Sequence, residues 1–317
     1  TNKICSFEAL ARWHDPERGE ILPRDFIPVL EETNKIHLLD HFIAKTAIQA
    51  LHARQQCGLP HVPVVINLTR RDFCLTDPAS VLNHLMEKYQ LLHIYLQVEI
   101  TETAFVDDEA ILTESIQKLR ASGYTVTLDN FGEGHSSLAA LQRCAIDEIS
   151  LDKVFFENFT KSSRLLLTSI LLMAKTLGIH TAAEGVRTKE QADFLRRIGC
   201  EKMQGPVCRP HATAIEQLRE VQAQAQQFES MLEQQVFRQV GLTNLVTDTP
   251  VALLADDGQS LHLLTANTSY QRALHLSGIN SIQEANERMR ELPQLIQSRL
   301  RALADATIRN RAPETEI

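Results

Sequence analysis

Acidic and amide side chains follow the short apolar runs in the first two thirds of the chain. These side chains are Asn67, Glu99, Asp129, Asp152, Glu184 and Gln204. Carboxylate and amide oxygens are the ligands that Mg²⁺ and Mn²⁺ prefer, and carboxylates brought together repel one another unless a cation neutralises them. An alternative is that each residue caps the next helix, which Asp and Asn often do. Glutamates are poor caps, so Glu99 and Glu184 favour a divalent-metal site.

The elements that must position these residues alternate between short apolar runs and longer amphipathic segments. The expected strands are 62–66, 94–100, 124–128, 146–151 and 179–183, and the expected helices are 38–56, 77–89, 107–122, 161–177 and 189–198. Strand–helix alternation repeated this often predicts an α/β fold with a parallel sheet, most economically a (β/α) TIM-like barrel. In such a barrel the carboxyl ends of the strands meet on one face, and that face carries the active site.

Charge and composition limit the kinds of partner that the protein can bind and the cellular compartment in which we expect it. The net charge is −8, from 40 acidic and 32 basic residues, so the surface is not a nucleic-acid footprint and we expect no nucleic-acid polymer as partner. The longest apolar stretch, 165–174, contains Thr168 and Ser169 and is too short to span a bilayer. The start has no signal-peptide pattern, and the six cysteines are scattered without a C-x-x-C pair. We therefore expect a cytoplasmic protein.

Short motifs occur in a fixed order between residues 6 and 210. They are Glu8-Ala9-Leu10 with Arg12 and Trp13, Pro23-x-x-Phe26-Ile27-Pro28, Asn67-Leu68-Thr69, Glu99-Ile100-Thr101-Glu102, Asp129-Asn130-Phe131-Gly132, Gly134-x-Ser136-Ser137-Leu138, Ala183-Glu184-Gly185-Val186 and Gln204-Gly205. The ordered set resembles the EAL domain family of bacterial (β/α) barrels. The resemblance implies hydrolysis of cyclic di-GMP to linear pGpG with two Mg²⁺ or Mn²⁺ ions.

The resemblance also implies roles for individual residues. Glu8, Asn67, Glu99 and Asp129 would hold the first metal ion, and Asp129 would bridge to a second ion with Glu184 nearby. Ligand contacts would come from Leu10, Arg12, Asp152 and Gln204. Two of these residues have an alternative role. Arg12 either binds a ligand phosphate or forms a surface salt bridge. Asp152 either contacts a guanine edge or caps a turn.

Three positions depart from the family pattern. Asn130 stands where an aspartate is expected, Ser150 where a lysine is expected, and Arg187 where a glutamate is expected. The charge changes of +1, −1 and +2 add up to +2. These departures predict one metal site, a weakened second site and impaired hydrolysis. The loop residues Glu133 and His135 also depart from the pattern, and in the family this loop helps form a dimer interface.

Three functions follow from the pattern and its departures. The first is a degenerate EAL module that binds cyclic di-GMP or regulates a partner with impaired hydrolysis, most simply as a homodimer. The second is a weakly or conditionally active phosphodiesterase, and the third is a dimeric scaffold without ligand. Glu8 lies near the start of the chain, so the helix and strand that precede it in the family are missing here. Either the sequence is cut at this point, or the protein continues upstream into another module such as a signalling domain. In both cases we expect a barrel edge covered by a partner or by the C-terminal part.

Composition divides the chain into three parts. Residues 1–211 form the EAL-like domain, and residues 212–240 have apolar positions at helical spacing, which predicts a long connector helix. This helix either pairs with a neighbouring molecule or packs on its own barrel. Residues 241–317 predict a small α+β domain, with a hairpin around Asp256-Asp257-Gly258. Fewer than 30 of these residues resemble the start of a PAS-like sensor, and an unrelated α+β cap is the alternative.

Overall fold

The structure is a computed structural model that describes residues 3–105, 109–132, 137–208, 228–256 and 260–310. The chain divides into two compact units. The first comprises residues 1–196 and 200–243, and the second comprises residues 197–199 and 244–317. No helix among the described residues is long and apolar enough to cross a membrane.

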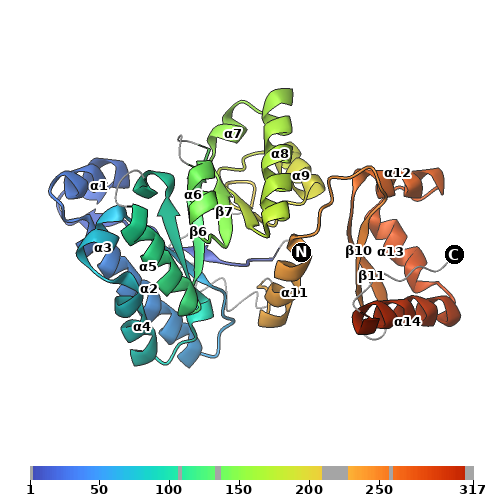
Figure 1. The fold of residues 1–317 in the computed structure, drawn as a ribbon, viewed down its shortest axis with the longest axis horizontal. Coiled ribbons are helices and arrows are strands. Elements are labelled where there is room, and N and C mark those ends of the chain that lie inside the picture. Colours follow the sequence, from blue (N-terminus) through green and yellow to red (C-terminus); the bar gives the residue numbers. More distant parts are fainter. Residues whose placement is uncertain (1–2, 106–108, 133–136, 209–227, 257–259, 311–317) are drawn as a thin grey trace. The chain divides into compact units, whose positions relative to one another are not determined.

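The first unit contains a seven-stranded sheet that curls into part of a barrel, with all its strands parallel (Figure 1). In the order of the sheet the strands are β1 (Phe7–Glu8), β4 (Val64–Leu68), β5 (Leu96–Thr101), β6 (Thr125–Phe131), β7 (Glu148–Leu151), β8 (His180–Ala183) and β9 (Lys202–Met203). The central strands are buried on both faces, and side chains such as Ile66, Val98 and Val126 are fully covered. This pattern is typical of a parallel sheet enclosed by helices. The predicted TIM-like (β/α) fold is confirmed.

Helices cover the outside of this sheet (Figure 1). They are α1 (Pro23–Glu32), α2 (Ile36–Gln56), α3 (Arg70–Leu75), α4 (Pro78–Lys88), α5 (Glu109–Ala121), α6 (Ser137–Arg143), α7 (Val154–Glu157), α8 (Lys161–Leu177) and α9 (Lys189–Ile198), with short 3₁₀ turns η1 (His93–Tyr95) and η2 (Glu102–Phe105). A small antiparallel hairpin, β2 (Trp13–Asp15) with β3 (Gly19–Ile21), follows β1. Helix α8 matches its predicted bounds because Thr160 caps its start and Gly178 ends it in a left-handed conformation.

Several strands lie later in the chain than their apolar runs predicted. Strand β4 covers Val64–Leu68 rather than 62–66, so Asn67 lies inside the strand and not after it. Asp129 likewise lies inside β6 rather than after 124–128, while Glu99 lies inside β5, within the predicted strand 94–100. The ladder pairs Asn67 with Glu99 and Thr101 with Asp129, so backbone pairing continues through these polar residues. The correction moves the side chains into the sheet but leaves them at its carboxyl end.

The prediction of one connector helix over residues 212–240 is wrong for the second half of that range. Phe228 is extended and forms a parallel bridge with Ile4, and the helix that follows, α11, begins only at Met231. The break has a physical cause: Phe228 packs with Val62 and Phe7 in an apolar cluster, which holds this point of the chain against the barrel. Residues 212–227 lie outside the described residues.

The second unit is a hairpin with three helices. Strands β10 (Ala252–Asp256) and β11 (Leu261–Ala266) pair antiparallel, as predicted, and the turn residues Asp257 and Gly258 lie outside the described residues. The helices are α12 (Thr268–Leu276), α13 (Ile282–Arg290) and α14 (Gln294–Asn310). Leu263, Ala266 and Ala285 form its small core. The similarity to a PAS-like sensor stays a prediction.

Candidate functional site

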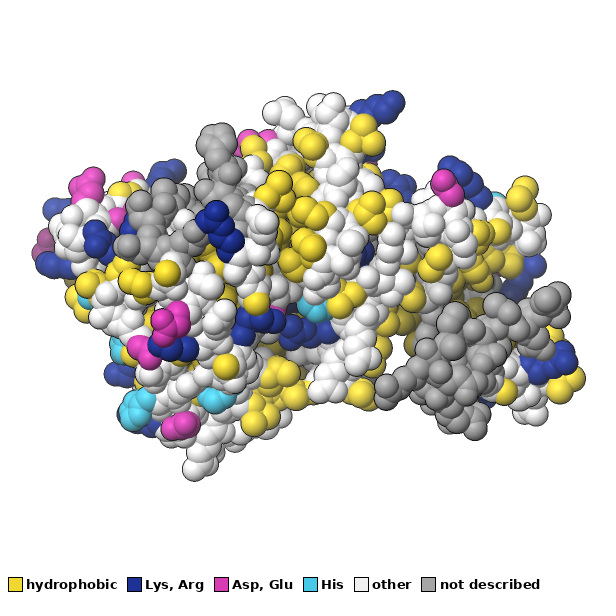
Figure 2. Space-filling view, in the orientation of Figure 1, with side chains coloured by type: hydrophobic (Ala, Val, Ile, Leu, Met, Phe, Trp, Pro, Cys, Tyr) yellow, Lys and Arg dark blue, Asp and Glu magenta, His cyan; other side chains and the backbone are white. Residues whose placement is uncertain are grey.

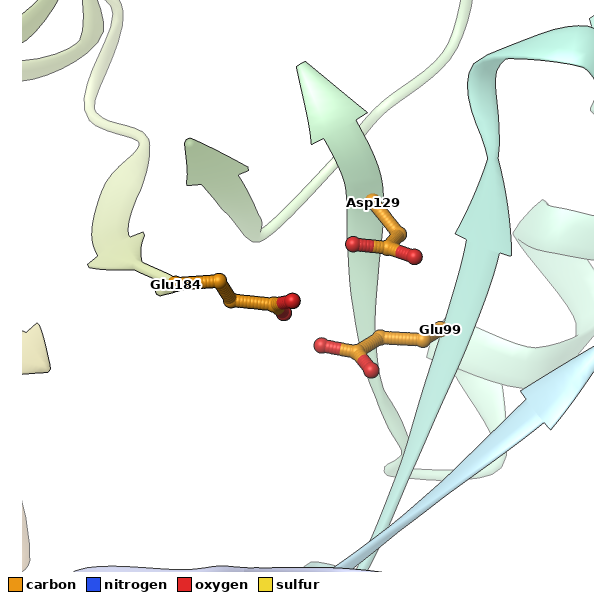
Figure 3. Close-up of side chains that lie close together, drawn as sticks. All are labelled: Glu99, Asp129 and Glu184. Carbon is orange, nitrogen blue, oxygen red and sulfur yellow. The ribbon is translucent and has the colours of Figure 1, made fainter. Parts of the chain in front are cut away.

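Three carboxylates from separate elements meet at the carboxyl end of the sheet. Glu99 comes from β5, Asp129 from β6 and Glu184 from the residue after β8, and their side chains point toward one another (Figure 3). One oxygen of each lies within 4.8 Å of the others. This spacing and the all-oxygen donor set suit a divalent cation such as Mg²⁺ or Mn²⁺.

Burial and mutual repulsion make this cluster electrostatically unfavourable when no cation is bound. Burial, followed by the charges of Asp129 and Glu8, raises the pKa of Glu99 well above its ordinary value. Burial and Asp129 also raise the pKa of Glu184 to about 7. A divalent ion would reverse both effects because it favours the charged carboxylates. The residues present therefore fit a metal ion.

A second set of side chains forms hydrogen bonds beside the cluster. Asn67 Nδ2 donates to Glu8 Oε1 over 3.1 Å, and Gln204 Nε2 donates to Glu8 Oε2 over 2.7 Å. Glu8 also raises the pKa of both Glu99 and Glu184, so it lies close to them. The structure thus brings Glu8, Asn67 and Gln204 to the same end of the sheet as the three carboxylates.

Asn130 lies at an irregularity of β6. The pairing of β6 with β7 shifts between Leu128 and Phe131, and Asn130 has a φ of 55°. Asparagine tolerates this left-handed conformation better than most residues, and one extra residue at such a point is a β-bulge. Its Nδ2 donates to Asp129 Oδ2 over 3.0 Å. Asn130 therefore adds an amide partner to Asp129 without adding negative charge.

Ser150 is fully buried on β7 and contacts Glu184 directly. Its Oγ donates to Glu184 Oε1 over 2.8 Å, and this hydrogen bond lowers the pKa of Glu184 against the larger effect of burial. Lys202 lies two strands away at the same level of the sheet, since Ser150 pairs with Ala182 and Ala182 with Lys202. Its ammonium bonds to Glu148 over 2.7 Å instead. Lys202 thus pairs with a different carboxylate from the one that Ser150 contacts.

The ligand-binding candidates lie around the cluster with different degrees of exposure. Leu10 is exposed, and Arg12 donates from Nη1 to its neighbour's carbonyl at Ala11 while its Nε lies 3.8 Å from Glu20. Asp152 is buried, and its Oδ1 accepts a hydrogen bond from the backbone N–H of Val154 over 2.7 Å. This contact corresponds to the turn-capping role given above as the alternative for Asp152. These contacts leave the exposed Arg12 able to turn toward a phosphate.

Arg187, the third altered position, is exposed, and its backbone N–H donates to Gln191 Oε1. The same Gln191 forms a reciprocal capping interaction with Thr188. The loop residues Glu133 and His135 lie outside the described residues, as does the side chain of Glu102.

One buried carboxylate was not among the predicted site residues. Glu148 begins β7 and is 5% exposed, and its charge contributes to the raised pKa of Glu99. A glutamate inside the apolar run 146–151 is the sequence signal that could have identified it. It forms an ion pair with Lys202 over 2.7 Å at the amino end of β7.

A curled parallel sheet that collects carboxylates at the carboxyl ends of its strands defines a (β/α) barrel protein with a candidate divalent-metal site. The chain belongs to the EAL domain family, because the model of this domain matches residues 1–210.

Similar proteins include two from Escherichia coli. The chain is 33% identical over 208 residues to the oxygen sensor protein DosP, covering 65% of this chain and 26% of that protein. It is 31% identical over 205 residues to the cyclic di-GMP phosphodiesterase PdeR, covering 64% of this chain and 31% of that protein. The solved structure of the PaMucR phosphodiesterase in complex with c-di-GMP is similar at a TM-score of 0.62 and 28% identity, covering 68% of this chain and 87% of that one. The chain thus spans only about a quarter to a third of these curated relatives.

Proposed function

We propose that the first unit binds cyclic di-GMP as a degenerate EAL module whose hydrolysis is impaired. The observation that carries the proposal is the contact of Ser150 with Glu184 inside an otherwise preserved carboxylate cluster. Relatives named as cyclic di-GMP phosphodiesterases and a solved c-di-GMP complex support a role in cyclic di-GMP signalling.

Each residue of the site has a role in this proposal. Glu99 and Asp129, with Glu8 and Asn67 beside them, would hold one divalent ion, which supplies positive charge to the phosphodiester oxygens. Arg12 would bind a phosphate with its guanidinium fork, and Leu10 would contact the ligand. Gln204 and Asp152 would orient ligand atoms at the rim.

Impaired hydrolysis follows from what the altered positions lack. A serine hydroxyl at position 150 cannot supply positive charge to a phosphate or lower the pKa of an attacking water. Asn130 offers an amide where a second carboxylate would attract another ion. Loss of one ion in a two-metal mechanism removes several kcal/mol of transition-state stabilisation, on the order of 10³-fold in rate.

The direct test is to incubate the full chain with cyclic di-GMP, separately with Mg²⁺ and with Mn²⁺, and to follow pGpG by chromatography beside a binding titration. Binding without pGpG supports the proposal. Steady turnover would establish the alternative, a weakly or conditionally active phosphodiesterase. No binding at high micromolar ligand would leave only the scaffold function.

A back-substitution separates the altered positions from other causes of low activity. The triple variant Asn130→Asp, Ser150→Lys, Arg187→Glu should gain metal-dependent hydrolysis of cyclic di-GMP. The matched control is Arg24→Gln, at an exposed arginine of α1. A triple variant that binds ligand and metal but stays inactive would contradict our explanation of the departures.

We also propose that the unit forms a homodimer through a second copy of this chain. Hydrophobic side chains gather over α8 and its neighbours (Figure 2), and Leu165 and Leu166 on this helix are more than half exposed. Contiguous apolar patches of this kind often mark protein interfaces. Sedimentation velocity of the wild type and of Leu165→Glu with Leu166→Glu tests this, and a monomeric wild type would contradict it.

A further inference from the structure

A polar groove lies at the end of the barrel opposite the carboxylate cluster. Two adjoining cavities of about 470 Å³ and 320 Å³ share Arg120, Asp147 and Arg238 in their linings. These residues lie near Thr125 at the start of β6, whereas Asp129 lies at its other end. Figure 2 shows Lys and Arg side chains gathered with a histidine between α5 and α11. The groove is therefore separate from the candidate metal site.

Arg120 is held in a fixed orientation in this groove. Its Nε and Nη2 donate to Asp147 Oδ1 over 3.0 and 2.9 Å, and Asp147 Oδ2 accepts from the backbone of Val126. The remaining nitrogen, Nη1, has no partner in the described part of the chain. A guanidinium held in this way is prepared for an anion because little further rotamer freedom is lost on binding.

Arg238 brings a second guanidinium from α11 (Met231–Gly241). Its Nη1 donates to Thr125 Oγ1 over 3.2 Å, and within the described ranges its other nitrogens have no protein partner. Two arginines against one carboxylate leave the groove with one excess positive charge in a chain of net charge −8. At the nearby carboxyl end of α5, carbonyls of the last turn accept from Ser122, Gly123 and Tyr124, which weakens their repulsion of an anion.

Helix α11 is itself docked on the barrel at both of its ends. At its start, Glu233 bonds to Lys3 over 2.6 Å. At its end, Lys175 of α8 donates to the carbonyls of Gly241 and Thr243. Arg238 thus enters the groove from a helix whose position the barrel holds.

We propose that this groove is a binding site for a small phosphate-bearing anion, which Arg120 of the barrel and Arg238 of α11 bind together. Tetrahedral oxyanions with two charges match two guanidinium groups, and a cavity of this volume admits a phosphate with a small attached group. The anion joins the barrel to α11, so its binding stabilises the docked helix.

The test titrates the full chain with inorganic phosphate in EDTA, against sodium chloride of equal ionic strength. Isothermal calorimetry gives the affinity, and hydrogen exchange of residues 231–241 reports on α11. We expect phosphate to bind in the millimolar range or tighter and to slow exchange in α11. Arg238→Gln should weaken binding at least tenfold, while Arg24→Gln, at an arginine whose side chain is 78% exposed, should leave it unchanged.

The role of Arg120 is tested with two variants, because removing its charge also leaves Asp147 without its ion-pair partner. Arg120→Lys keeps the charge but loses the fork and should weaken phosphate binding, and Arg120→Gln should weaken it further. Phosphate that acts no differently from chloride, or binding that Arg238→Gln leaves unchanged, would overturn the proposal. Cyclic di-GMP binding should survive in Arg238→Gln, so the outcome here is independent of the proposed function.

Discussion

The two ends of the barrel sheet carry opposite charge and are stabilised differently. At the carboxyl end, Glu99, Asp129 and Glu184 converge, with one oxygen of each within 4.8 Å of the others. At the amino end, two carboxylates have cationic partners: Glu148 binds Lys202 and Asp147 binds Arg120. Strand β6 joins the two ends, since Asp129 and Thr125 are about 13 Å apart along it.

The difference shows which ligand charge each end suits: a cation at the carboxyl end, and an anion beside the arginines of the amino end. Buried carboxylates that repel one another destabilise the fold unless a cation binds, which is common at functional sites. At the amino end the polar contacts are intramolecular and hold α11 in place. Repulsion among carboxylates therefore destabilises one end of the sheet, and hydrogen bonds and ion pairs stabilise the other.

The largest expected effect is at the carboxyl end. Glu99→Gln should weaken Mn²⁺ or Mg²⁺ binding by at least roughly 100-fold, because even outer-sphere changes at metal sites cost 10–100-fold. The metal-free variant should at the same time melt higher than wild type, since the substitution removes a carboxyl whose pKa is raised by burial and repulsion. Calorimetry and thermal unfolding measure both effects. Glu31→Gln, at an exposed glutamate of α1, is the control, and an unchanged metal affinity would refute the assigned metal site.

The pH dependence of the free energy of unfolding reports on the repulsion among the carboxylates at the carboxyl end of the sheet. The pKa of Glu184 is raised from 4.5 to about 7, so the folded state binds more protons than the unfolded state between these values. The free energy of unfolding of the metal-free protein should therefore fall as pH rises from 5 to 8, by about 2 kcal/mol. Saturating Mg²⁺ should restore it at pH 8. Denaturant titrations measure this, and Glu184→Gln should flatten the profile; a wild-type stability that rises over this range would contradict the prediction.

At the amino end, Gly241→Ala should loosen α11. A Cβ at position 241 would lie 2.1 Å from Glu201 Oε2, and Glu201 is held by His180 over 2.7 Å. Displacing it should cost about 1–2 kcal/mol, as overpacking of close contacts does. Denaturant unfolding gives the stability, and hydrogen exchange of residues 231–241 locates the effect. The control is Gln239→Ala on the same helix, and equal stability of both variants would argue against tight docking.

The smallest effect is expected for Lys175→Met. The variant keeps the apolar stem but removes the ammonium that donates to the carbonyls of Gly241 and Thr243. A cation at a helix carboxyl end contributes about 0.5–1 kcal/mol. Exchange of the amides of α11 should accordingly speed up about two- to fivefold. Lys161→Met, at an exposed position of α8, should not change these rates.

Local signals in the sequence predicted five of the helices and the convergence of acidic side chains at one end of the sheet. The bounds 161–177 and 189–198 agree with α8 and α9, because caps at Thr160, Gly178 and Thr188 act over a few residues. Regular spacing of acids and apolar runs also predicted that Glu99, Asp129 and Glu184 would meet. Strand bounds were less accurate, since the parallel ladder continues through Asn67 and its neighbours.

Long-range contacts could not be predicted in this way. The bond between Ser150 and Glu184, the bridge of Phe228 with Ile4 and the contact of Arg238 with Thr125 join residues 34, 224 and 113 positions apart. Each depends on how the whole sheet curls and which helix covers its end. The sequence by itself determined the residue types and their periodicity, which act locally. Only the tertiary structure decided which charged groups lie close together and how deeply they are buried, because distance and burial, not order in the chain, set electrostatic energy.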